Sequence, residues 1–314
     1  MFLGVDGGGS RTRALVCDAT GRVLGCGEGG SSNFKLAPPE AVRGALETAI
    51  QAALAEAAGG PLAAFLGMAG VATAEDRAAV VALAKSIPVL DDAMIEAGHD
   101  VQIALEGGLS GAPGIALIAG TGSSCYGRNA AGESYECGGW GDLVDDVGSG
   151  AWLGLRALQS CVRQADGREA ETGLKAAVMD FLRIESMDEF KHRIHRVGLS
   201  RPERARLAPV VSRLCADGDP AAGALIDEAV IGLAELVAAT AWRLGIDSPK
   251  IVLAGGLMAD AAFREAVRHA IETAVAKAQV LPARLPPIAG AALLALKLGG
   301  VAVNEAVITR LASA

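Results

Sequence analysis

The sequence predicts an α/β protein built from two domains. Short apolar strand patterns alternate with amphipathic helix patterns in the first part of the chain, and a mid-chain group of strands is followed by mostly helical sequence. A glycine-rich turn occurs twice between apolar runs, at residues 7–10 and 120–123. Glycine and proline interrupt the pattern at 111–114, so we expect one domain over 1–112 and another over 113–314. The final helix is the element that can pack back toward the first domain.

The elements of the first domain follow from periodicity and from the residues that start and stop helices. Pro38-Pro39 begin one helix, and Thr73 with Asp76 forms an acidic variant of the capping box at the start of the next. The expected strands are 2–6, 12–18, 22–28, 63–68 and 94–97, and the expected helices are 39–57, 74–86 and 101–110.

The second domain opens with a strong strand and a meander, after which apolar residues recur at helical spacing. Pro286-Pro287 begin a last apolar helix. The expected strands are 114–119, 124–127, 134–137, 251–254 and 280–281, and the helical stretches are 151–162, 222–239, 260–275 and 289–298.

Composition excludes several classes of function. The chain has 314 residues, of which 51% are hydrophobic, so it can form a large core. Only 4% of the residues are aromatic and the net charge is −8, and both values argue against a nucleic-acid partner. No apolar run is long enough to span a bilayer, and Asp6 interrupts the N-terminus too early for a signal peptide. We therefore expect a cytoplasmic protein that binds neither nucleic acid nor membrane.

The six cysteines include no C-x-x-C pair, which disfavours zinc, a redox dithiol and a compact iron–sulfur motif. Cys125 and Cys137 can face each other across a hairpin. Two reduced, buried thiols are the favoured interpretation of this pair.

The two glycine turns are candidate phosphate sites. Without Cβ atoms, backbone N–H groups of a turn can approach a polyphosphate closely, and two such turns suggest two half-sites that clamp one nucleotide. The alternative is a pair of ordinary hairpins. The residues concerned are Gly8, Gly9 and Ser10 in the first turn, and Gly120, Thr121, Gly122 and Ser123 in the second. Hydroxyls of Ser10 and Thr121 suit phosphate oxygens.

Two carboxylates stand where phosphoryl transfer would need them. Asp6 ends the first strand directly before the glycines, which suits a ligand of Mg²⁺ held through water; a turn-forming Asp is the alternative. Asp100 follows one expected strand and precedes a helix, at an edge where ligands of α/β proteins collect. It is the candidate general base, with a helix N-cap as the alternative.

A loop rich in glycine and carboxylates could bind a sugar. It contains Gly138–Asp142 and Asp145–Ser149, whose carboxylates can accept hydrogen bonds from vicinal hydroxyls. Trp140 could pack against a sugar face, although a core tryptophan is the commoner use. Ser31-Ser32-Asn33 adds a polar group, and Gly255-Gly256 leave room for a flat adenine unless they form an ordinary turn.

Together these segments resemble the N-acetylglucosamine kinases of the actin/hexokinase/Hsp70 ATPase superfamily, in the branch that also holds the benzoyl-CoA reductase activator ATPases. The motifs cover nearly the whole chain in the family's order. They are Asp6–Ser10, Ser32-Asn33, Ala119–Ser123, Gly138–Gly141, Asp146–Ser149 and Leu253–Gly256. The segment Gly138–Gly141 with the following Asp-x-Gly-Ser is the specific part.

The resemblance implies two actin-like (ribonuclease H-like) domains that flank a nucleotide and sugar cleft, and a homodimer. It implies that Ser10 and Thr121 meet ATP phosphates, that Asp6 holds Mg²⁺ and that Asp100 activates the 6-hydroxyl. Further residues implied to line the sugar are Asn33, Gly139, Trp140 and Asp146. Two positions depart from the family: Ser10 stands where Thr is common, and Val147 where Glu is frequent, with Asp145 as a nearby substitute.

We therefore expect an ATP- and Mg²⁺-dependent kinase for the 6-hydroxyl of an amino sugar, N-acetylglucosamine first. Glucosamine and N-acetylmuramate remain alternative substrates. An ATPase that activates a reductase is a second interpretation, although no cysteine pattern for a bridging cluster is evident. A sugar-binding regulator without catalysis is a third, and the presence of both Asp6 and Asp100 argues against it.

Overall fold

The computed structural model describes residues 1–57 and 59–312. The chain divides into two compact units, of which the first combines Met1–Ala116 with Pro282–Ala314 and the second is Leu117–Leu281. The expected division counted residues 282–314 in the second domain; in the structure this segment packs within the first unit.

The first unit is built on a five-stranded sheet of order β3-β2-β1-β4-β5. β1 pairs antiparallel with β2 and β2 with β3, whereas β4 runs parallel to both β1 and β5. The strands are β1 (Phe2–Gly7), β2 (Thr12–Cys17), β3 (Val23–Gly29), β4 (Ala63–Met68) and β5 (Met94–His99).

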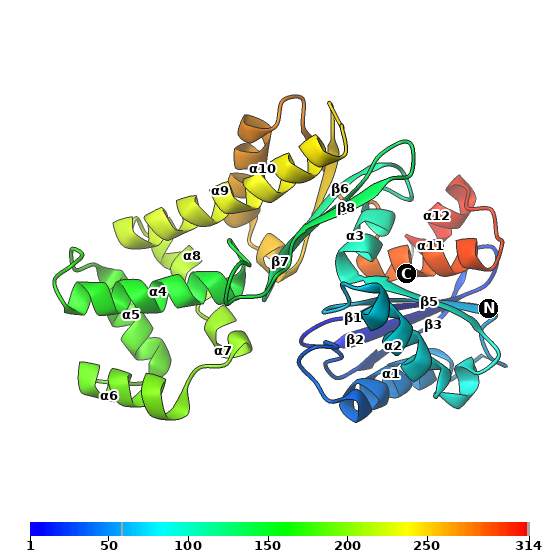
Figure 1. The fold of residues 1–314 in the computed structure, drawn as a ribbon, viewed down its shortest axis with the longest axis horizontal. Helices are drawn as coiled ribbons and strands as arrows, with labels where there is room; N and C mark the ends of the chain where they lie inside the picture. The colour runs from blue at the N-terminus through cyan, green and yellow to red at the C-terminus, as the bar shows by residue number, and fades with distance from the viewer. Residues whose placement is uncertain (58, 313–314) are drawn as a thin grey trace. The chain divides into compact units, whose positions relative to one another are not determined.

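Helices cover both faces of this sheet (Figure 1). One core lies under α1 and α2, and a second lies under α11 and α12, with α3 packed against α11. The helices are α1 (Pro39–Ala53), α2 (Ala74–Lys85), the short 3₁₀ helix η1 (Pro88–Leu90), α3 (Asp100–Gly108), α11 (Pro287–Leu298) and α12 (Glu305–Leu311).

α11 joins the first unit because its surface is apolar nearly all round. Eight of its residues are buried, and its backbone lies so close to β1 that a Cβ at Gly4 would come within 2.4 Å of the Ala292 nitrogen. On α3, the buried carboxylate of Glu106 pairs with Lys297 of α11. Burial of apolar area is therefore the main force that returns the end of the chain to the first sheet.

The second unit repeats the strand order of the first. Its sheet reads β10-β9-β6-β7-β8, so the first strand is again central, with the next two strands on one side and the last two on the other. β7 and β8 pair antiparallel, and β9 and β10 pair parallel. The strands are β6 (Gly114–Ala119), β7 (Ser123–Arg128), β8 (Ser134–Gly138), β9 (Lys250–Ala254) and β10 (Gln279–Leu281).

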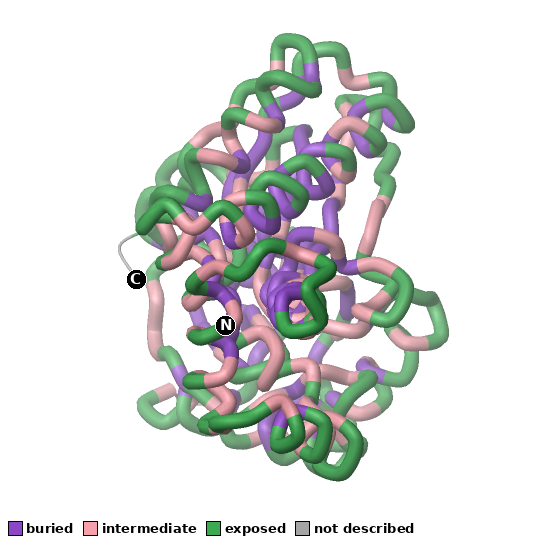
Figure 2. Tube along the Cα trace, turned by 90° about the vertical axis from the view of Figure 1, so that its left-hand side faces the viewer, coloured by how far each residue is buried: buried purple, intermediate pink, exposed green. Residues whose placement is uncertain are grey.

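A helical insertion between β8 and β9 makes up most of the second unit (Figure 1). Buried positions follow the inner faces of its long helices (Figure 2). The helices of the insertion are α4 (Gly150–Ala165), α5 (Gly173–Leu182), α6 (Met187–His192), the π-helical turn η2 (Arg193–Val197), α7 (Arg201–Ala205), α8 (Ala208–Ala216) and α9 (Pro220–Arg243). The 3₁₀ helix η3 (Gly256–Ala259) and α10 (Ala261–Ala274) follow β9.

The predicted α/β class in two domains is confirmed. Most expected helices and strands differ from the observed ones only at their ends, whereas α5, α6, α7, α8 and α12 were not expected individually. The helix expected over 39–57 ends at Ala53, and the strand expected over 94–97 continues to His99. All six residues of β5 pair with residues of β4. This pairing joins segments far apart in the chain, so the local periodicity of residues 94–99 could not predict where the strand ends. Among the described residues, no helix combines the length and apolar character needed to cross a membrane.

Candidate functional site

One group of candidate residues lies where three strands of the first unit end together. Gly7 of β1 is paired with Met68 of β4, which is paired with His99 of β5. Because these strands run parallel, the residues that follow them meet at one edge of the sheet. Asp6, the first glycine turn and Asp100 are therefore brought to the same edge.

The first glycine turn is short and open. The Gly8 N–H donates to the Arg11 carbonyl at 2.9 Å, which closes the turn between β1 and β2. Gly9 and Ser10 are exposed, and a Cβ at Gly9 would meet no atom within 4 Å. Their backbone is accessible to a ligand, as the phosphate hypothesis requires.

Asp6 is paired with a residue that the sequence did not reveal. Arg13 lies directly opposite on β2, and its Nη2 donates to Asp6 Oδ2 at 2.5 Å. Burial raises the pKa of Asp6; the guanidinium of Arg13 opposes this, and the charge of Asp100 adds to it. Two carboxylates near one another each disfavour the charge of the other.

Asp100 does not cap its helix. His99 holds the N-cap position of α3, and Asp100 is the first helical residue. Its Oδ1 lies 2.8 Å from His99 Nδ1, and 23% of its side chain is exposed. The carboxylate therefore lies beside His99, whose Nδ1 accepts from the Val101 N–H at 3.3 Å, and it is partly open to solvent, as a general base must be.

The loop that carries Asn33 is tied to the same edge of the sheet. The Ser32 N–H donates to the Gly8 carbonyl at 3.1 Å, and the Phe34 N–H donates to the Ala69 carbonyl at 3.1 Å. A Cβ at Gly70 would lie 2.8 Å from Asn33 Oδ1, so the glycine makes room for this amide. Asn33 thus stands beside the first glycine turn, although 27 positions separate it from Asp6 in sequence.

The second glycine turn, in the second unit, is held by the start of α4. The N–H groups of Gly150 and Ala151 donate to the carbonyls of Gly120 and Thr121 at 2.8 and 3.2 Å. Ser123 Oγ donates to the Val147 carbonyl at 2.9 Å. Helix and turn are therefore one rigid assembly.

The step Gly255-Gly256 packs directly on this turn. Gly255 has φ +98° and ψ 163°, and a Cβ there would lie 2.3 Å from the Ala119 carbonyl oxygen. A Cβ at Gly256 would meet nothing within 4 Å. The ends of β6 and β9 are thus brought together, with open space at Gly256.

The loop after β8 relies on glycine backbone conformations and has an exposed tip. Gly138, Gly139 and Gly141 all have positive φ, and Trp140 between them is 81% exposed. Because its side chain is so exposed, Trp140 is not a core tryptophan. Val147, at the position where the family often has Glu, lies against α9, where a Cβ at Gly232 would overlap its Cγ1.

Asp146 is the buried centre of an ion-pair cluster. It is 1% exposed, adopts a positive φ of 59° and pairs with Arg201 Nη2. Arg201 Nε also lies 3.6 Å from Asp142 Oδ1, and Arg204 pairs with Asp142 Oδ2. Burial raises the pKa of Asp146, and the charge of Arg201 opposes that shift.

A magnesium ion would have few protein ligands here. Within residues 1–57 and 59–312, no three His, Cys, Asp or Glu side chains gather in a group able to hold a metal by themselves. Mg²⁺ usually keeps several waters and binds one or two carboxylates plus substrate phosphates. Asp6 fits that pattern, because it is a partly exposed carboxylate beside the open glycine turn.

The expectation of two reduced, buried thiols at Cys125 and Cys137 agrees with the burial of Cys125 but not with that of Cys137. Cys125 and Cys137 are register partners on β7 and β8, and both are free thiols. Burial raises the pKa of Cys125 to about 12, so its thiol stays protonated. Cys137 is only partly buried.

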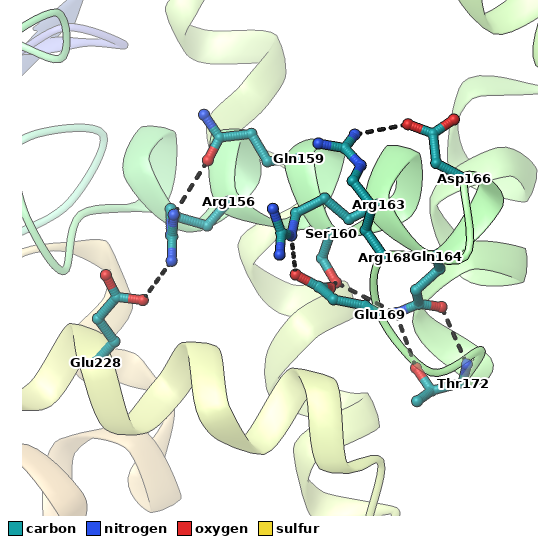
Figure 3. A network of polar contacts seen from close by, with 10 residues as sticks. All are labelled: Arg156, Gln159, Ser160, Arg163, Gln164, Asp166, Arg168, Glu169, Thr172 and Glu228. Atoms are coloured by element: carbon teal, nitrogen blue, oxygen red, sulfur yellow. Dashed lines mark hydrogen bonds and ion pairs between the residues drawn. The ribbon is translucent and has the colours of Figure 1, made fainter.

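A cavity of about 530 Å³ lies away from these residues, between α4 and the segment formed by α6 and η2. It contains none of the predicted site residues. Its arginine rim belongs to a network in which Arg156 pairs with Glu228 and Arg163 with Glu169 (Figure 3). Because each of these guanidiniums already has a carboxylate partner, the network ties α4 to its neighbours.

Sequence reasoning missed the basic partners of the acidic residues. Arg13, Arg201 and Arg204 were not singled out, although each forms an ion pair with a site or loop carboxylate. The last two lie 55 and 62 positions from their partners. Their only local sign is the i, i+3 spacing that places both on one face of a helix.

Comparison with known proteins agrees with the motifs. The model of the BadF/BadG/BcrA/BcrD ATPase family matches residues 3–295. The N-acetylmuramic acid/N-acetylglucosamine kinase of Clostridium acetobutylicum is 33% identical over 262 residues, which cover 82% of this chain and 85% of that protein. The N-acetyl-D-glucosamine kinase of Dictyostelium discoideum is 25% identical over 315 residues, which cover 94% of this chain and 98% of that protein.

Among solved structures, a candidate N-acetylglucosamine kinase from Chromobacterium violaceum superimposes with a TM-score of 0.74 at 31% identity. The match covers 94% of this chain and 98% of that one. The resemblance drawn from the motifs and the predicted two-domain, actin-like fold are confirmed by these matches.

Proposed function

The chain belongs to the BadF/BadG/BcrA/BcrD ATPase family, and from this premise we propose that it is an ATP-dependent kinase of an amino sugar. The acceptor is the 6-hydroxyl, and N-acetylglucosamine is the first candidate substrate. One observation carries the proposal: the partly exposed carboxylate of Asp100 stands at the same sheet edge as Asp6 and the first glycine turn.

Asp100 acts as the general base. Its partly exposed carboxylate accepts the proton of the attacking hydroxyl. Asn33, held beside the glycine turn, binds a non-reacting hydroxyl of the sugar. Open backbone N–H groups of Gly9 and Ser10 contact phosphate oxygens.

In the second unit, the turn Gly120–Ser123 contacts phosphates, and the open space at Gly256 receives the adenine. Asp146 accepts hydrogen bonds from sugar hydroxyls, with Gly139 and Trp140 beside it in sequence on a loop whose tip is exposed. These roles are supported by the rigid assembly of turn and α4 and by the exposure of Trp140.

Asp6 would hold Mg²⁺, through water or directly once Arg13 has moved away. When bound, the metal supplies positive charge that offsets the charge of the phosphates. Burial raises the pKa of Asp6, and the positive charge of Arg13 opposes that shift and so favours the ionised carboxylate.

The test is a coupled ADP-release assay with ATP and Mg²⁺ across N-acetylglucosamine, N-acetylmuramate, glucosamine and glucose. We expect the highest kcat/KM with N-acetylglucosamine and a product whose ³¹P–¹H coupling lies at C6. If ADP release is independent of every sugar, the kinase proposal fails.

The main rival is an ATPase that activates a reductase through a cluster shared by two subunits. An anaerobic UV–visible spectrum of the purified protein separates the two functions. We expect no charge-transfer band; a band near 400 nm with sugar-independent ATP hydrolysis would favour the activator.

We also propose a homodimer. Ile231 and Trp242 on α9 are 56% and 80% exposed, and their spacing of 11 residues places both on one helix face after three turns. Light scattering after size exclusion should give twice the chain mass, and Trp242→Glu should give the monomer.

A further inference from the structure

The arginine that pairs with Asp146 also covers the second glycine turn. A Cβ at Gly122 would overlap Arg201 Nη2 and would lie 3.0 Å from Asp146 Oδ2. Gly122 does not have a positive φ, so its backbone conformation does not require glycine. The small residue is therefore needed for space, and the occupant of that space is the guanidinium of Arg201.

Without its arginines this part of the turn would repel phosphate. Asp142 and Asp146 are the carboxylates beside it, and they would place two negative charges near a nucleotide anion. Arg201 and Arg204 balance those charges. The glycine turn can attract phosphate only while this balance holds.

Arg201 has capacity for another partner. Its side chain is 22% exposed, so a ligand can reach part of the guanidinium. Its Nε is buried, lies 3.6 Å from Asp142 Oδ1 and makes no hydrogen bond within the described residues. Arg204 Nε is likewise buried and without a hydrogen bond there. A planar guanidinium with unused donors beside a glycine turn is well suited to bind a phosphate oxygen pair.

We propose that Arg201 binds the phosphates of ATP at the second glycine turn and exchanges its contact with Asp146 for them. The proposal rests on the roles given above to the turn and to Asp146. When phosphate takes the guanidinium, Asp146 loses its partner and its carboxylate becomes free to accept hydrogen bonds from the sugar. Nucleotide binding therefore strengthens sugar binding, and by reciprocity sugar strengthens nucleotide binding.

The experiment measures binding of the non-hydrolysable analogue AMPPNP with Mg²⁺, by calorimetry and without sugar. Arg201→Gln should raise Kd about 10-fold or more, since a charged bidentate contact is lost, and Arg201→Lys should recover part of the loss. Arg163→Gln is the matched control, because Arg163 is an exposed arginine on α4 with one carboxylate partner (Figure 3). Its Kd should equal that of the wild type.

A second variant covers the case in which Arg201→Gln does not fold because Asp146 is left buried and unpaired. Arg201→Gln combined with Asp146→Asn removes both charges and should bind AMPPNP as weakly as Arg201→Gln. Asp146→Asn alone should bind AMPPNP as well as the wild type or more tightly, because Arg201 is released to the phosphate.

The effect of AMPPNP on sugar affinity distinguishes the proposal from a purely structural ion pair, which would leave that effect unchanged. In the wild type, AMPPNP should lower the Kd for N-acetylglucosamine, and in Arg201→Gln it should not. If Arg201→Gln binds AMPPNP within twofold of the wild type, or if Asp146→Asn weakens binding as much as Arg201→Gln, Arg201 is only a counter-ion and the inference is wrong. If the wild type itself binds no nucleotide, the proposed kinase function fails with it.

Discussion

Asp6 and Arg13 are direct partners across β1 and β2, joined by a 2.5 Å hydrogen bond from Arg13 Nη2 to Asp6 Oδ2. Burial favours the neutral form of Asp6, whereas the guanidinium favours the carboxylate. Arg13 therefore limits the rise in the pKa of the carboxylate that would hold a metal.

Arg13→Gln should shift the acid limb of the kcat/KM profile to higher pH. Removal of the positive charge leaves burial and the charge of Asp100 to raise the pKa of Asp6 further. Fewer molecules then carry the Asp6 carboxylate at a given pH, and activity falls first on the acid side. The measurement is a pH–rate profile at saturating Mg²⁺; an unchanged acid limb would mean that Asp6 does not control it.

Asp6→Asn should make stability less sensitive to pH. The folded pKa of Asp6 is raised above its ordinary value of 3.8 by burial, so ionisation of Asp6 opposes folding. Wild-type stability relative to Asp6→Asn should therefore fall as pH rises from 3.8 through the folded pKa. Urea unfolding across that range measures the difference.

Asp18→Asn is the control of opposite sign. Burial alone would raise the pKa of Asp18, but hydrogen bonds from Thr20 and Arg22 outweigh it and lower the pKa. The ionised Asp18 therefore favours folding, a contribution that is lost as pH falls through its folded pKa. If the unfolding free energies of Asp6→Asn and Asp18→Asn, each relative to the wild type, change with pH in the same direction, the opposite signs given to the two pKa shifts are wrong.

Local sequence predicted much of this fold because its signals are local. Pro38-Pro39 began a helix, and Thr73 with Asp76 forms the expected capping box. Asp6 and Asp100 were each predicted at a strand end, and β1 and β5 end there in the structure. Such positions depend on neighbours a few residues away.

What could not be predicted depends on partners far along the chain. The contact of Arg201 with Gly122 and Asp146 requires α7 to fold over the turn, 55 positions from Asp146. The packing of α11 on β1 depends on how much apolar area is buried in total. The helical pattern shows that α11 is apolar, but it does not indicate the sheet on which the helix packs. Periodicity gives the face of a helix, not its partner.

Gly255→Ala should destabilise the protein, whereas Gly256→Ala should not. Gly255 has φ +98° and ψ 163°, a region open essentially to glycine alone, and a Cβ there would overlap the Ala119 carbonyl. We expect a loss of about 1–3 kcal/mol for Gly255→Ala. A Cβ at Gly256 would meet nothing within 4 Å. Thermal unfolding without ligand compares the two, and equal Tm values would contradict the packing of β9 on β6.

Asp100→Asn should lower kcat about 10²-fold or more while it changes the KM for sugar little. The amide keeps the shape of the side chain and can still hydrogen-bond the hydroxyl, but it cannot accept the proton. Asp146→Asn should do the reverse and raise KM more than it lowers kcat, because its carboxylate would hold hydroxyls that do not react. Steady-state kinetics on the best sugar, with folding checked by thermal unfolding, separates the two roles. If Asp100→Asn keeps a near wild-type kcat, the base lies elsewhere, and Asp145 or Asp146 becomes the leading candidate.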